Sequence, residues 1–178
     1  TIDELETLRE QNPHQTIRIK IADTRGGALE AGFKLSHAIN QLGDIDLECA
    51  GNLQSMIANI FVSYQGGKRI ASESCTNFML HDIIYTTPTK SIGTASFVRT
   101  HVDGMMENLR TPFRMMTQAT ANATGMSIES ASALFGEDCH LTPHQAYSLK
   151  LLDEFEDATN STFPEQLTNP DPAQIYEI

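Results

Sequence analysis

The stretch TIRIKIADTRGGALEAGFKLSHAINQLGDIDLECAG, residues 16–51, places two short alternating segments on either side of a longer one with a different period. Ile17, Ile19 and Ile21 alternate with basic residues, which is the pattern of a strand. Residues 28–42 repeat apolar side chains at the helical period of about 3.6 residues, and residues 44–51 alternate again. The stretch therefore predicts strand, helix, strand, with a turn at TRGG after the first strand.

The same alternation continues along the chain. Residues 55–65 have the pattern of a buried helix, and residues 68–72 and 76–82 read as strands, the second ending on His81. Strands alternating with helices predict βαβ units with right-handed crossovers and a largely parallel sheet. In such a sheet functional groups gather beyond the carboxyl ends of the strands. We therefore expect the loops at residues 24–27, 50–55 and 81–82 to meet at one edge.

The remaining segments are mainly helical. A Thr-x-x-Glu capping box at Thr1 predicts an opening helix, and we expect native sequence upstream of it. Residues 95–123 read as one long helix, which Pro112 should kink or split, and part of its apolar face is expected to pack against another subunit. Two core helices meeting at Pro112 are the alternative. A short helix near Ser127, a loop at residues 136–140 and a helix capped by Thr142 follow.

Length and composition bound the class of protein. With 178 residues, of which 40% are hydrophobic, the chain suits one globular domain over residues 1–157, followed by a polar tail at 158–178 expected on the surface or disordered. A net charge of -11 argues against nucleic acid or an anionic membrane as partner. There is neither a long apolar span nor a signal core, so a cytoplasmic location is expected. Three cysteines without a C-x-x-C pair indicate reduced thiols.

Ser55 precedes a buried helix, and its position allows either a helix cap or a nucleophile. As a nucleophile it needs a base and donors for an oxyanion. The N–H of Met56 would be unpaired at the helix start, and a glycine of the Gly26-Gly27 turn can bring a second N–H close. His81 at a strand end could act as base and Asp138 could orient it. From spacing alone, a structural histidine and a solvated aspartate are the more common cases, and they remain open.

Other residues suggest weaker alternatives. Cys139, His140 and His144 are potential metal ligands, but the helix start between the two histidines argues against a shared face. Lys68 could serve as the base of a Ser-Lys dyad. We expect no metal and no cofactor.

A family resemblance gives these residues defined roles. The segments IRIKIADTRGGALEAGFKLSHAI, GNLQSM, GGKRIASESCTNFMLHD and LTPHQAYSLKLLDEF follow the order of motifs in the ClpP family, the proteolytic subunit of Clp protease, over about residues 5 to 155. The resemblance implies an α/β fold, a ClpP/crotonase-like spiral of βαβ units with a long handle helix. It places the nucleophile on Ser55, the base on His81, the acid on Asp138 and the oxyanion donors on Gly27 and Met56.

The resemblance also implies an activity and an assembly. The chain is expected to be a serine endopeptidase that hydrolyses unfolded or extended polypeptides inside a homo-oligomeric ring, heptameric and either single or stacked. It leaves open whether an AAA+ unfoldase docks. The family's SPGG is TRGG here, so Arg25 replaces a proline in a loop that should line the substrate, and AASM is LQSM, with Gln54 beside the serine. The HQP motif reads HDI, and the stretch between His81 and Asp138 is longer than usual.

These departures keep other functions in view. The first is a catalytically inert, architectural member of the family. A head-maturation peptidase of the phage type, or a signal-peptide-type peptidase of the same fold, is another. A crotonase-type thioester enzyme would share the spiral fold, but it has no need of a Ser-His-Asp triad.

Overall fold

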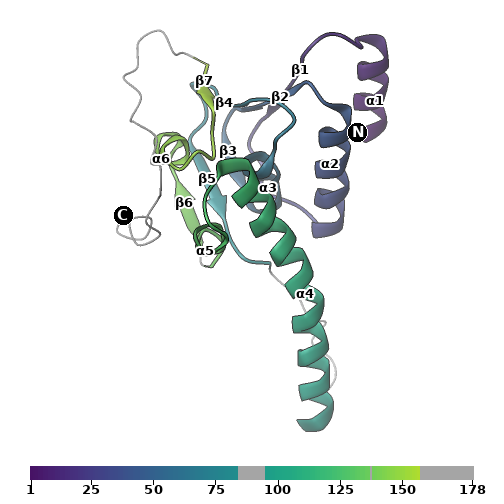
Figure 1. Cartoon of the computed structure of the whole chain (residues 1–178), viewed down its shortest axis with the longest axis vertical. Helices are drawn as coiled ribbons and strands as arrows, with labels where there is room; N and C mark the ends of the chain where they lie inside the picture. The colour runs from purple at the N-terminus through teal and green to yellow at the C-terminus, as the bar shows by residue number, and fades with distance from the viewer. Residues whose placement is uncertain (84–94, 137, 157–178) are drawn as a thin grey trace.

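The computed structural model describes residues 1–83, 95–136 and 138–156, with the elements arranged as in Figure 1. They are, in order, α1 (Ile2–Gln11), β1 (Ile17–Ile21), α2 (Leu29–Leu42), β2 (Ile45–Cys49), β3 (Asn52–Gln54), α3 (Ser55–Ser63), β4 (Arg69–Ala71), β5 (Asn77–Leu80), α4 (Ala95–Thr124), α5 (Ile128–Ala133), β6 (Cys139–Leu141), α6 (Pro143–Ser148) and β7 (Glu154–Phe155). The predicted α/β class, with βαβ units and a long helix, is confirmed. The expected tail, residues 158–178, lies outside the described residues.

The described strands form two sheets rather than one. The first is parallel and four-stranded, in the order β1-β2-β4-β7, with Ile17 paired to Ile45 and Ile21 to Cys49. The second has the order β3-β5-β6, with β3 parallel to β5 and β6 antiparallel to it. A single largely parallel sheet was the sequence-based expectation. The expected number of sheets is wrong, because β3, β6 and β7 have only two or three residues each and are too short to show the period of two in the sequence.

The chain passes from the first sheet to the second in each of three successive units. After β1, Thr24 forms a parallel bridge with Leu53 of β3. After β2, two residues lead directly into β3, and β4 is followed by β5 in the same way after a longer loop. Each unit therefore contributes one segment to each sheet. This succession is the predicted spiral, and it brings equivalent positions of neighbouring units side by side.

Helix α3 forms the centre of the core. Seven of its nine residues are buried, among them Ile60, Phe61 and Val62, and it contacts α2, α4, β3 and β5. An apolar surface on all sides is what a fully enclosed helix requires. The rings of Phe61 and Phe78 lie 5.4 Å apart and join α3 to the second sheet. The first residue of this helix is therefore held by a rigid element.

An ion pair between a buried arginine and an exposed aspartate ties the end of the fold to β4. The guanidinium of Arg69 donates to both carboxylate oxygens of Asp153, at 2.8 and 2.7 Å, and also to the carbonyl of Val62. The Arg69 side chain is 5% exposed, against 37% for Asp153. The backbone N–H of Arg69 donates to the same carboxylate at 2.8 Å. Removing the carboxylate would leave a buried charge unpaired.

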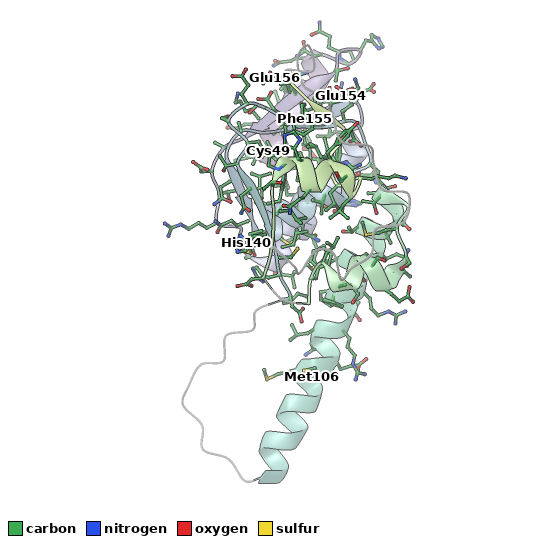
Figure 2. The ribbon with its side chains drawn as sticks, turned by 90° about the vertical axis from the view of Figure 1, so that its left-hand side faces the viewer. Cys49, Met106, His140, Glu154, Phe155 and Glu156 are labelled. Atoms are coloured by element: carbon green, nitrogen blue, oxygen red, sulfur yellow. The ribbon has the colours of Figure 1, made fainter. Side chains whose placement is uncertain are left out.

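Helix α4 runs unbroken through Pro112, so the alternative of two helices meeting there is wrong. Figure 1 shows its first half projecting from the domain, while its second half packs against α3 and α5. Met116 is buried in this packing, whereas Met106, on the projecting part in Figure 2, is 53% exposed. The packing offsets the backbone hydrogen bond that a proline removes from a helix. Among the described helices, none is long and apolar enough to cross a bilayer.

The predicted helix caps are present, and one predicted loop is shorter than expected. The capping boxes at Thr1 and Thr142 are both present, with Pro143 opening α6. The loop expected at residues 136–140 is wrong at its end, because Cys139 and His140 already belong to β6. Their strand pairs with β5, and this long-range pairing has no local signal in the sequence.

Candidate active site

Ser55 lies at a sharp turn between a strand and a helix. Strand β3 ends at Gln54, α3 begins at Ser55, and Ser55 has φ 56°, in the left-handed region that non-glycine residues rarely adopt. Gln54 occupies the N-cap position and no side chain caps the helix. Ser55 is therefore not an N-cap. A strained strand-to-helix turn of this kind presents a serine hydroxyl outward for attack.

The loop after β1 lies directly against this serine. A Cβ built on Gly26 would stand 2.5 Å from Cβ and 2.9 Å from Oγ of Ser55, and the φ of Gly26 is 93°. A real side chain at position 26 is excluded on both counts. Gly27, in contrast, would carry a Cβ with nothing within 4 Å. The sequence indicated the glycine pair but could not tell which member makes the close approach.

Hydrogen bonds fix the two loops to each other. The carboxylate of Asp23 accepts from the backbone N–H of Asn52 at 2.7 Å, and the N–H of Thr24 donates to the carbonyl of Asn52 at 3.0 Å. The Thr24 hydroxyl accepts from the N–H of Gly26 at 3.2 Å. The position of the TRGG loop relative to Ser55 is therefore set by hydrogen bonds to Asn52, the first residue of the strand that leads into Ser55.

The second sheet places the other two candidate residues at the same edge. His81 follows the carboxyl end of β5, which runs parallel to β3, and Asp138 immediately precedes the antiparallel β6. Leu80 pairs with Cys139, so continuing this register by one residue sets His81 opposite Asp138. His81 is half-buried and Asp138 is exposed. The ends of β3, β5 and β6 thus gather Ser55, His81 and Asp138 at one edge of one sheet.

The hydrogen bonding of His81 differs from that of a completed triad. Nδ1 bonds to the carbonyl oxygen of Asp82, which can only accept, so Nδ1 carries the proton. In the neutral ring this leaves Nε2 with a free lone pair, the form that a general base requires. Among the described residues, no hydrogen bond joins His81 to Ser55 or to Asp138. The role of the Asp82 carbonyl was not foreseen, because a backbone acceptor leaves no mark in a sequence.

The two residues expected to donate to an oxyanion belong to the start of α3 and to the loop after β1. The N–H of Met56 belongs to the first turn of α3, whose amide protons have no partner within the helix and point out of its positive end. The Met56 side chain is buried and so close to Gly32 that a Cβ there would lie 2.2 Å from Met56 Cγ. Gly27 is exposed in the facing loop. The Met56 amide therefore directly follows Ser55 in the helix start, while the residue of the facing loop that approaches Ser55 is Gly26.

The residues considered for other chemistry lie elsewhere. Cys139 is buried, and burial raises its pKa to about 11, whereas its neighbour His140 is exposed on the opposite face of β6. No cluster of three potential metal ligands occurs in the described part of the chain. Lys68 bonds to Glu154 at 2.5 Å, and this carboxylate raises the lysine pKa. A cation held in this way is unsuited to act as the base of a Ser-Lys dyad.

Comparison with known proteins gives one family. The family model described as Clp protease matches residues 1–158, which covers most of the chain and every candidate residue named above. No curated protein matches the chain at a significant level.

Proposed function

Because the chain belongs to the Clp protease family, we propose that it is a serine endopeptidase in which Ser55 is the nucleophile, His81 the general base and Asp138 the residue that orients the imidazole. The observation that carries the proposal is the turn at Ser55: a left-handed serine between β3 and α3, contacted by Gly26, with no capping role. A left-handed non-glycine residue costs on the order of 1 to 3 kcal/mol, and residues strained in this way cluster at active sites.

The chemistry follows from the atoms at this edge. His81 Nε2 accepts the proton of the Ser55 hydroxyl as Oγ bonds to the carbonyl carbon of a peptide. The N–H groups of Met56 and Gly27 then stabilise the negative charge on the carbonyl oxygen. The protonated ring returns the proton to the leaving amine, and water repeats the sequence to release the acyl group from Ser55. The imidazolium formed in between would be stabilised by the carboxylate of Asp138.

This mechanism requires one local adjustment. In the structure the Nδ1 proton is donated to the Asp82 carbonyl, so Asp138 can orient the ring only after His81 rotates. Hydrogen bonds of a catalytic group are often long or misaligned without substrate and tighten when it binds. We propose that assembly or peptide binding supplies this change, inside a ring formed by copies of the chain. The substrate class is extended polypeptide, and the cytoplasm is the proposed location.

A fluorophosphonate probe tests the assignment. We expect the assembled protein to form one adduct, located on Ser55 by peptide mass spectrometry, and Ser55→Ala to lose both the adduct and peptide cleavage. Ser36→Ala, which removes a hydroxyl from α2 instead, should keep both. Cleavage that survives in Ser55→Ala, or an adduct on another residue, would refute the assignment.

The second candidate function is that of an inert structural subunit, and the His81–Asp82 bond favours it. If the chain is inert, size-exclusion chromatography and electron microscopy will show rings, while the probe leaves Ser55 unmodified even with peptide present. Labelling in the assembled state alone would instead support the peptidase.

A further inference from the structure

Arg25 is an exposed cation in the loop that contacts the candidate nucleophile. It directly precedes Gly26, whose Cβ position lies 2.5 Å from Ser55 Cβ. Consecutive Cα atoms are about 3.8 Å apart, so the Arg25 Cα lies one such step from Gly26. A peptide bond attacked by Ser55 would therefore lie only a few residue lengths from Arg25. Within the described residues, the Arg25 guanidinium has neither an ion pair nor a hydrogen bond. It is therefore available to a ligand.

The register of the second sheet shows what surrounds this cation. Thr24 forms a parallel bridge with Leu53, and continuing this register by one residue sets Arg25 beside Gln54. Gln54 pairs with Met79 of β5, and Met79 pairs with His140 of β6. Paired residues share a face of a sheet. Gln54 and Met79 are half-buried, and His140, labelled on β6 in Figure 2, is exposed. This row of residues on the solvent side of the sheet offers cationic and amide donors and contains no carboxylate.

Among the described residues, the nearest acidic groups form no ion pair with Arg25. Asp23, two residues before Arg25, keeps its negative charge, but its Oδ1 accepts from the N–H of Asn52. Asp82 and Asp138 lie beside His81, on the other side of the candidate nucleophile. In a chain with net charge -11, Arg25 is thus an exposed cation without an ion pair among the described residues, in the residue that precedes the contact with Ser55. Such a group attracts an acidic side chain and disfavours a basic one.

Building on the proposed peptidase, we propose that Arg25 is a specificity-determining residue that selects polypeptides with a glutamate or aspartate one or two residues from the cleaved bond. An extended peptide advances about 3.3 Å per residue, so a side chain at that distance from the reacting carbonyl falls within reach of the guanidinium. Gln54, next to Arg25 in the row, supplies an amide that can donate to the same carboxylate.

The first test uses cleavage. Short internally quenched peptides, identical except for Glu, Gln or Lys at one scanned position, are compared by kcat/KM. For the wild type we expect about a tenfold preference for Glu over Gln at low salt, shrinking at high salt because exposed charges are screened. Arg25→Gln should bring the ratio close to one, and Arg25→Glu should favour the Lys peptide. Lys34→Gln, which removes a cation from α2, should leave the ratio unchanged.

The second test does not depend on turnover. Fluorescein-labelled Glu and Gln peptides are titrated with Ser55→Ala protein, with and without Arg25→Gln, and binding is followed by anisotropy. Tighter binding of the Glu peptide that disappears with Arg25→Gln supports the inference, even if the fluorophosphonate probe shows that Ser55 is unreactive. Cleavage with equal ratios for wild type and Arg25→Gln overturns the inference and leaves the peptidase standing. Thermal melting and ring size of Arg25→Gln should match the wild type, which excludes a folding defect as the cause.

Discussion

Replacing Gly26 by alanine tests the geometry on which the active site depends. The new Cβ would meet Ser55 Cβ at 2.5 Å, Ser55 Oγ at 2.9 Å and the carbonyl oxygen of Gln54 at 3.0 Å. Apolar carbon atoms normally approach to about 3.5 to 4.0 Å, so Ser55 or the TRGG loop must move by about 1 Å. The same alanine would also have to adopt φ 93°, which disfavours any residue with a Cβ.

The cost can be divided by matched variants. Gly125 has φ 76° and nothing within 4 Å of its Cβ position, so Gly125→Ala measures backbone strain alone. Left-handed strain costs about 1 to 2 kcal/mol, reduced by about 0.4 to 1 kcal/mol because alanine restricts the unfolded chain. Gly27→Ala has neither strain nor contact and should be close to neutral. Overpacking adds about 1 to 3 kcal/mol to the net strain, so Gly26→Ala should lose about 1 to 5 kcal/mol, always more than Gly125→Ala.

Two assays separate the effects on stability and on the site. Urea unfolding at one protein concentration ranks the three variants, since ring assembly would otherwise shift the apparent stability. The fluorophosphonate labelling rate of the still-folded protein reports on Ser55. We expect Gly26→Ala to lose most of its labelling, while Gly125→Ala labels at the wild-type rate. The reasoning fails if Gly26→Ala is as stable as Gly125→Ala and labels normally.

Three further predictions concern the core. Asp153→Ala should lower the free energy of unfolding in urea by about 3 kcal/mol, because it leaves the buried Arg69 guanidinium without its carboxylate partner. Glu154→Gln, which removes a charge from the exposed pair with Lys68, should cost less than about 1 kcal/mol, and equal losses for the two variants would contradict this reasoning. Burial raises the pKa of Tyr64 to about 12 from 10.0, so the stability linked to this group is complete below pH 10 and is lost as the pH rises through 12. A tyrosinate absorbance titration should show one tyrosine that ionises near pH 12 in the folded protein, and its absence would contradict the burial of Tyr64. Burial likewise raises the pKa of Cys139 to about 11 from 9.0, so its contribution is lost from pH 9 upward, and maleimide should modify it in urea but not in the native protein near neutral pH.

The long elements could be predicted from the sequence because each carries its own period. The strand at Ile17–Ile21 and the helix at Leu29–Leu42 have enough residues to repeat their pattern, and the structure agrees with them within one or two residues. The strand Asn52–Gln54 could not be recognised, because three residues fit a loop as well as a strand. Its existence depends on pairing with β5, more than twenty residues away, and with Thr24.

The candidate site shows the same division. A serine before an apolar helix could be identified, but its left-handed backbone depends on how β3 enters α3, which no local pattern encodes. The glycine pair was visible, while the contact of Gly26 rather than Gly27 depends on the Thr24–Leu53 bridge. The partner of His81 Nδ1 is a carbonyl, and every residue has one. Residue types could thus be predicted, whereas their relative positions required the second sheet.

The spiral itself explains why these particular residues meet. Each unit sends a segment into the second sheet, and each segment ends at the same edge: the first with Gly26, the second with Ser55 and the third with His81. Equivalent positions in successive units become neighbours, so the contributing residues can lie far apart in the chain and still share one site. Strand β6 then returns antiparallel, and for that reason Asp138 joins the edge by preceding its strand rather than following it. A change that shifted the register of β6 by one residue would turn Asp138 to the other face of the sheet and separate it from His81. It would also turn the buried Cys139 and Leu141 out of the core, so the register that places Asp138 is the one that the core requires.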